Sequence, residues 1–117
     1  MTKKGFLFLA ALVVTGVLAV ARIANAFRQD DMDKLNKSKQ CPKCDFSDAK
    51  FWGVQLVAAD LSGANLSRAN LGRSNLTGAN LKGALLVGTN LKDANLSNAT
   101  WVDGRTCKEG SLGECVR

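Results

Sequence analysis

The chain has 117 residues and a formal charge of +6, with four Cys, one Pro, and neither His nor Tyr. This length allows one small domain together with a targeting segment. The absence of His excludes catalysis by a histidine base and zinc sites with imidazole ligands.

The first 26 residues have the pattern of a secretory signal peptide. A start with two lysines precedes an uncharged, mostly apolar stretch over residues 5–21, and Ala24 and Ala26 are the small residues that a signal peptidase reads. We expect cleavage after Ala26 and a periplasmic or secreted protein. The alternative is an uncleaved anchor formed by residues 5–21, which would attach the protein to a membrane, although about 17 residues is the lower limit for spanning a bilayer.

Residues 27–43 are expected to form an N-terminal cap. Acidic residues come first and basic residues follow, a charge order that stabilises a short helix through its dipole. These residues are Asp30, Asp31 and Asp33, then Lys34, Lys37 and Lys39. A disordered linker is the alternative interpretation of this segment.

From Cys44 to Asp103 the sequence repeats every five residues. Twelve consecutive blocks fit without an insertion, and in each block the third residue is large and apolar while the first is small or apolar. We expect the third residues to form the core. They are Phe46, Phe51, Leu56, Leu61, Leu66, Leu71, Leu76, Leu81, Leu86, Leu91, Leu96 and Trp101.

A five-residue period fits neither an α-helix nor a flat strand. On a helix each step of five residues turns the side chain by a net angle of about 140°, which spreads the leucines around the whole circumference. On a flat strand an odd step places successive leucines on opposite faces. A chain that turns a corner once per block keeps the first and third residues inward, with Gly, Asn, Asp and Ser at the corners. The period therefore predicts a solenoid of stacked coils.

The block pattern, Ala-(Asp/Asn)-Leu-(Ser/Thr/Lys/Arg)-x, resembles that of the pentapeptide repeat family over residues 44–103. This resemblance implies an all-β fold, a right-handed quadrilateral β-helix with four blocks per coil and about three coils. Residues twenty apart then lie on neighbouring coils. We expect Asp48 beside Arg68 and Arg73 beside Asp93. The second-position asparagines are expected to form corner and ladder hydrogen bonds.

Two apolar residues interrupt the polar exterior. Leu85 occupies a second position, where most blocks have Asn or Asp, and Val87 lies close to it. They are either isolated surface residues or part of a contact patch with Arg68.

The four cysteines flank the solenoid, with Cys41 and Cys44 before it and Cys107 and Cys115 in a C-terminal cap loop over residues 104–117. Stacked coils would separate the two pairs by roughly 10–15 Å, which is too far for a shared metal or a disulfide between the ends. We expect two local disulfides, Cys107–Cys115 and Cys41–Cys44. A buried free thiol is the alternative for Cys44.

No residue pattern indicates a catalytic, metal or cofactor site, so we expect a non-enzymatic protein-interaction or structural scaffold module. Its partner would be an unidentified protein or a second copy of the chain, with no nucleic acid and no small-molecule substrate. The alternative is a periplasmic thiol-disulfide redox protein that uses Cys41 and Cys44, although such thiols need an activating helix N-terminus. DNA mimicry is known for some members of the resembling family, but it requires a long acidic rod. It is disfavoured here because this chain is short and basic. Nucleic-acid binding is disfavoured because the repeat places Arg68, Arg73, Lys82 and Lys92 on different faces.

Overall fold

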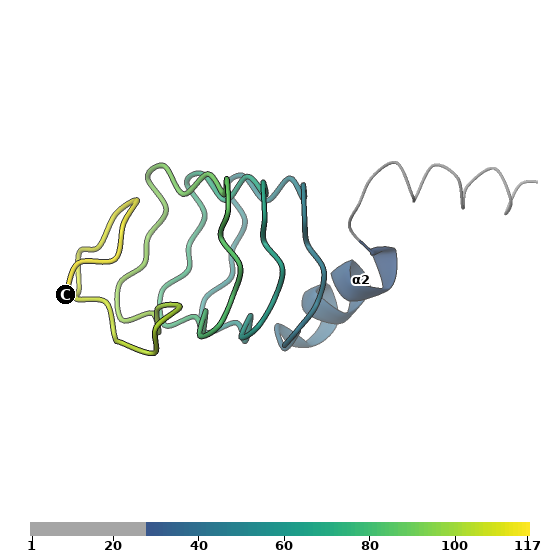
Figure 1. The fold of residues 1–117 in the computed structure, drawn as a ribbon, viewed down its shortest axis with the longest axis horizontal. Helices are drawn as coiled ribbons and strands as arrows, with labels where there is room; N and C mark the ends of the chain where they lie inside the picture. Colours follow the sequence, from purple (N-terminus) through teal and green to yellow (C-terminus); the bar gives the residue numbers. More distant parts are fainter. Residues whose placement is uncertain (1–27) are drawn as a thin grey trace, which may run out of the picture.

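Figure 1 shows the computed structural model of the protein, which describes residues 28–117. One helix, α2 (Gln29–Ser38), lies across one end of a stack of coils, and the C-terminal segment lies at the other end. The expected signal peptide over residues 1–26 lies outside the described residues. Within the part that the structure describes, no helix is both long and apolar enough to cross a membrane.

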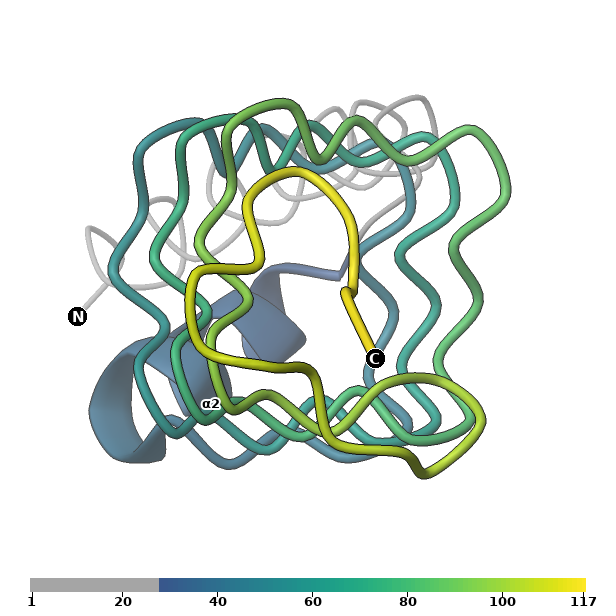
Figure 2. The same cartoon turned by 90° about the vertical axis from the view of Figure 1, so that its left-hand side faces the viewer.

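Each coil of the stack contains twenty residues. Parallel bridges join second-position residues to the residue twenty positions later, beginning with Gln40 and Asp60 and ending with Asn80 and Thr100. The N–H of a third residue donates to the second-position carbonyl of the next coil, as from Leu66 to Leu85 at 2.9 Å. Figure 2 looks along the stack and shows the coils superimposed. These contacts are isolated bridges rather than long strands, because a turn lies on both sides of each paired second-position residue from Asp45 to Thr100.

The corners of the coils are tight turns. The first residue of a block donates its N–H to the third residue of the preceding block, as from Ala49 to Phe46 at 3.0 Å. The fifth residue of eleven of the twelve blocks has a positive φ, which is 66° at Gly63 and 59° at Arg68. A positive φ at the third residue of a four-residue turn is typical of type II, which favours Gly or Asn there.

The inward residues fill the interior of the coils. Nine of the twelve third-position residues expose at most 1% of their surface, and most first-position alanines are fully buried. The inward hydroxyl of Ser74 donates to the carbonyl of Leu71 at 2.6 Å. The remaining third-position residues, Leu86, Leu91 and Trp101, are only partly buried. All three belong to the last coil, which has no complete coil above it.

The solenoid begins one block earlier than the expected boundary at residue 44. Gln40 pairs with Asp60, and the N–H of Lys43 donates to the carbonyl of Ser62 at 2.8 Å. Residues 39–43 therefore form a further block, in which Cys41 takes the inward place that Leu has elsewhere. The expected N-terminal cap is reduced to helix α2 and the residue before it.

Helix α2 covers the first coil with one apolar side. Asp30 and Asp31 lie in its first turn and Lys37 in its last turn, as the charge order predicts. Leu35 is 1% exposed and joins the core. The carboxylate of Asp31 accepts a hydrogen bond of 2.8 Å from the N–H of Asp45, which ties the helix to the first coil.

Two substitutions one position apart test the inward and outward assignment. Leu71 is fully buried, so Leu71→Asp should lose about 1.5–3 kcal/mol of apolar burial and several more from desolvating the carboxylate. Asn70→Asp keeps the side-chain oxygen that accepts the N–H of Gly72, and its effect should stay within about 0.5 kcal/mol. Denaturant unfolding of both variants measures the difference. Equal losses of stability would contradict the register.

Candidate interaction surfaces

The outer faces of the solenoid differ in charge. We call the surface formed by the outward side chains of residues 45–48, 65–68 and 85–88 the Leu85 face, and that of residues 50–53, 70–73 and 90–93 the Trp52 face. The Leu85 face has two Asp and one Arg, whereas the Trp52 face has three basic residues and one Asp. In the twelve blocks of residues 44–103, the Trp52 face is therefore the one with a clear positive charge.

The Leu85 face brings together the three candidate contact residues of the sequence analysis. Leu85 is 53% exposed and Val87 is 74% exposed. Leu85 pairs with Asn65 of the coil below, and the N–H of Arg68 donates to the carbonyl of Val87 at 2.8 Å. The two apolar side chains and Arg68 thus share one face.

Asp48 and Arg68 form the ion pair that the twenty-residue register predicts. The guanidinium of Arg68 donates two hydrogen bonds, of 2.7 and 2.8 Å, to the carboxylate of Asp48. The hydrogen bonds from Arg68 hold the pKa of the Asp48 carboxyl below its usual value. Because this charge of Arg68 is already paired, the Leu85 face offers a partner mainly apolar contacts.

The corresponding pair on the Trp52 face does not form. Arg73 and Asp93 lie on neighbouring coils, as expected, but they make no ion pair in the described part of the chain. The guanidinium carbon of Arg73 lies over the ring of Trp52, 5.7 Å from its centre. A cation over an indole face is attracted by the ring quadrupole, and this contact has replaced the expected pair.

The second-position asparagines form the expected corner and ladder hydrogen bonds. The side-chain oxygen of Asn70 accepts the N–H of Gly72 at 3.0 Å, and the same geometry recurs at Asn90 with Lys92 at 2.9 Å. The amide of Asn90 also donates to Asn70 across the coils at 3.1 Å. These side chains therefore stabilise the turns and the stack.

One part of the last coil has an open backbone edge. In lower coils the N–H groups of third and fifth residues donate to the next coil, but those of Leu86, Gly88, Leu91 and Asp93 have no acceptor among residues 28–117. The C-terminal segment covers the neighbouring part of the end, where Leu96 donates to Ser111 at 2.8 Å. Figure 2 shows this segment over only part of the end.

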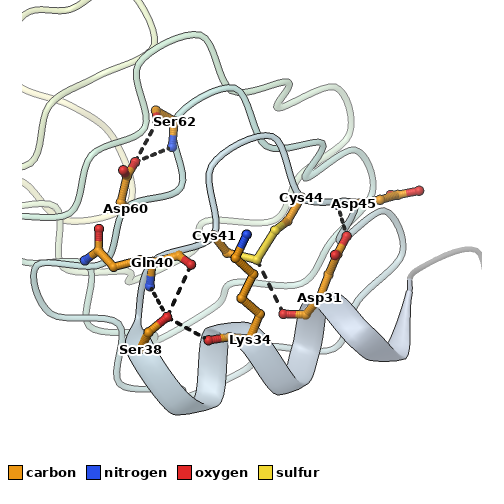
Figure 3. The surroundings of a disulfide bond; sticks show 9 residues. All are labelled: Asp31, Lys34, Ser38, Gln40, Cys41, Cys44, Asp45, Asp60 and Ser62. Atoms are coloured by element: carbon orange, nitrogen blue, oxygen red, sulfur yellow. Dashed lines mark hydrogen bonds between the residues drawn. A yellow bond between two sulfur atoms is a disulfide. The ribbon is translucent and has the colours of Figure 1, made fainter.

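Cys41 and Cys44 form a disulfide inside the first turn of the solenoid (Figure 3), with their Cα atoms 5.5 Å apart. Cys41 is fully buried and Cys44 is 5% exposed. The pair follows the C-terminus of α2, where the negative end of the helix dipole does not stabilise a thiolate. Pro42 occupies the second position of the turn, which it favours. The Cys-Pro-Lys-Cys motif is therefore a turn closed by a disulfide. The burial of its two cysteines disfavours the redox alternative.

The same corner contains the candidate ligand set for a metal. Asp31, Cys41 and Cys44 have ligand atoms within 4.8 Å of one another. Both sulfurs are used in the disulfide, and the Asp31 carboxylate accepts the N–H of Asp45. These groups are engaged in holding α2 on the first coil, which is a structural role.

Cys107 and Cys115 form the second predicted disulfide, with their Cα atoms 5.0 Å apart. It closes the loop that pairs with the last coil, where the N–H of Asn98 donates to the carbonyl of Cys107 at 3.0 Å. The disulfide therefore fixes the cover over one part of the open end.

Comparison with known proteins agrees with this architecture. A family model described as pentapeptide repeats matches residues 44–83 and 74–100, with eight copies. One similar solved structure is HetL from the cyanobacterium Nostoc sp. strain PCC 7120, a pentapeptide repeat protein involved in heterocyst differentiation regulation. It is 37% identical to this chain, with a TM-score of 0.57, and the match covers 57% of this chain and 32% of HetL. The pentapeptide repeat protein Rfr23 from the cyanobacterium Cyanothece 51142 is 35% identical over 53% of this chain and 46% of its own, with a TM-score of 0.46.

The chain spans about a third of the length of HetL and about half of that of Rfr23. No curated protein matches it. The fold and the likeness to solved structures define a right-handed β-helix repeat protein. The chain belongs to the pentapeptide repeat family.

The C-terminal disulfide should contribute measurably to stability. Replacing Cys107 and Cys115 by Ala opens a loop of nine residues, and chain entropy predicts a loss of about 2–3 kcal/mol. Unfolding of the variant and peptide mapping of the unreduced wild type provide the measurements. Finding both thiols free for alkylation in the unreduced wild-type protein would contradict the pairing.

The Asp48–Arg68 pair should give a pH-dependent contribution to stability. Because the pKa of Asp48 is lowered in the folded protein, its contribution is complete above the usual carboxyl range and is lost as the pH falls through the folded-state pKa. Asp48→Asn should therefore differ from wild type by a constant amount at neutral pH, and the difference should shrink below about pH 4. Urea unfolding from pH 7 to pH 2 measures it. A difference that is unchanged at pH 2 would exclude the ion pair as its cause.

Proposed function

We propose that the protein is an exported, non-enzymatic interaction module that binds a partner protein at its last coil. The observation that carries this proposal is the open edge over residues 84–91, where the unpaired N–H groups of Leu86, Gly88 and Leu91 lie beside exposed Leu85 and Val87. In the lower coils every third- and fifth-position N–H from Cys41 to Gly83 donates to the next coil, and Leu96 and Asn98 donate to the C-terminal segment.

An extended segment of a partner suits this edge better than a flat surface does. The free N–H groups have the spacing that the next coil would use, so a strand added in parallel could accept these hydrogen bonds through its carbonyls. Its inward side chains would cover Leu86 and Leu91, which are only partly buried without a coil above them. Leu85 and Val87 would add apolar contact at the rim, where aliphatic and polar groups commonly mix.

Export is proposed from the signal pattern of the first 26 residues and from the two disulfides. Paired cysteines persist in oxidising compartments such as the periplasm. The hydroxyls of Ser47 and Ser62 donate to the carboxylates of Asp45 and Asp60 at the corners of the coils, where they stabilise the turns, and this supports a non-enzymatic role. A structural scaffold role at the cell envelope would use the same edge and face.

The double substitution Leu85→Lys, Val87→Lys tests the proposed surface. It places two charges beside the open edge and should abolish crosslinks to the partner in the producing cells. The matched control is Gln55→Lys, Val57→Lys, which changes the same block positions on another face and replaces a Val that is 49% exposed. The control should leave the crosslinks unchanged.

Hydrogen exchange of the isolated complex tests the binding mode. The amides of Leu86, Gly88 and Leu91 should become protected when the partner binds, because a strand at the edge would accept their protons. Crosslinks that persist in a folded Leu85→Lys, Val87→Lys variant would overturn the surface. Turnover of a thiol-disulfide substrate that depends on Cys41 would overturn the non-enzymatic function.

A further inference from the structure

The Trp52 face contains a hollow that the five-residue repeat does not explain. Its volume is about 320 Å³, and its wall consists of Trp52, Gly72, Arg73, Asn90, Lys92 and Asp93. This volume is at the lower end of the range of small-molecule sites, about 300–1,000 Å³. The hollow crosses the three coils rather than following one of them.

Gly72 makes the floor of this hollow possible. It is the one Gly at the fourth position of the twelve blocks, and its backbone conformation does not require Gly. A Cβ at residue 72 would lie 3.1 Å from Cδ1 of Trp52, so any larger residue would displace the indole. Trp52 covers Gly72, which is buried, while 59% of the Trp52 surface remains exposed.

The charged groups around the hollow have no ion-pair partner among residues 28–117, although Arg73 contacts the ring of Trp52. The ion pairs of residues 28–117 join Asp48 to Arg68 and Asp103 to two arginines, so none involves the side chains of Arg73, Lys92 or Asp93. Both polar groups of the Asn90 side chain are already engaged, with Lys92 N–H and Asn70, and they shape the wall. A ligand can thus contact two cations, one carboxylate and the exposed part of the indole beside Arg73.

These groups define the chemistry of an occupant. Arg73 and Lys92 attract an anion, and a guanidinium binds a carboxylate through two parallel hydrogen bonds. Asp93 repels a second negative charge nearby and accepts hydrogen bonds, so it favours a ligand that also carries hydroxyl groups. The exposed part of the indole favours an apolar surface in contact with it. A bare anion would satisfy only Arg73 and Lys92. A polyanion with closely spaced charges would be repelled by Asp93.

We propose that this hollow binds a carboxylate-bearing sugar unit. The ring carboxylate lies between Arg73 and Lys92, the hydroxyl groups donate to Asp93, and the C–H face of the ring packs beside Trp52. The site lies on a different face from Leu85, and its ligand binds without requiring the proposed protein contact.

The indole N–H signal of Trp52 in the full chain provides a direct readout by NMR. Trp101→Phe identifies which of the two Trp signals belongs to Trp52. Sodium glucuronate should shift the Trp52 signal in a saturable way. Glucose lacks the carboxylate, and sodium acetate lacks the sugar ring with its hydroxyl groups. Each should bind at least about tenfold more weakly than glucuronate.

Substitutions assign the binding to named groups. Arg73→Gln and Gly72→Ser should each weaken glucuronate binding about tenfold, the first by removing the guanidinium and the second by displacing Trp52. Lys92→Gln should also weaken it, whereas Lys82→Gln is the matched control, with the same charge change at the same block position on another face. Leu85→Lys, Val87→Lys should leave glucuronate binding unchanged, which separates this site from the partner surface.

Several results would overturn the proposal. Acetate binding as tightly as glucuronate would show a general anion site, and tighter binding of a Glu-rich peptide would assign the hollow to an acidic protein segment. An unshifted Trp52 signal with glucuronate would exclude the sugar acid. If Gly72→Ser does not fold, the Arg73→Gln and Lys92→Gln variants decide the outcome.

Discussion

The twenty-residue register of the stacked coils is the constraint on which the other features depend. Each side of a coil pairs through one second-position residue, as Asn70 pairs with Asn90, and the turn beside it directs the next third residue inward. A single inserted residue would move a Leu from the interior to the surface and would break both neighbouring bridges. The same register places Asp48 against Arg68 and Trp52 below Gly72. Surface chemistry in this protein is therefore fixed by block position and not by local loop conformation.

A stack with so few coils is dominated by its ends. Leu35 of α2 completes the core below the first coil, and two disulfides hold the corners where the chain enters and leaves the stack. The last coil is covered less completely, which leaves Leu86 and Leu91 partly exposed. Uncovered sheet edges readily pair with other chains, so proteins normally cover or charge them. The open part beside Leu85 is neither covered nor charged, and this is why we place a partner there.

Much of the fold could be predicted because the five-residue period has one consistent physical solution. The inward leucines, the local disulfides and the Asp48–Arg68 pair all follow from it. The first block was missed because Cys41 and Pro42 replace the residues that define the pattern, although their turn has the same hydrogen bonds. The prediction of an Arg73–Asp93 ion pair rests on register alone and is wrong. Register shows which side chains are neighbours, but it does not show whether Arg73 will contact the carboxylate of Asp93 or the indole of Trp52. The hollow over Gly72 depends on a contact between residues twenty apart, which becomes recognisable only when the coils are stacked.

The two proposed surfaces meet along the last coil, which has a consequence for their energetics. Leu91, whose N–H would bind an added strand, lies between Asn90 and Lys92 in the wall of the hollow. A strand that pairs with Leu91 would cover the upper rim of the hollow and exclude water from Lys92, which strengthens its attraction for a carboxylate. The two ligands would then favour each other by the same factor in both directions, because coupling between sites is reciprocal. A partner strand that carries its own acidic residue at this place would instead compete with the sugar acid, so the sign of the coupling reports the chemistry of the partner.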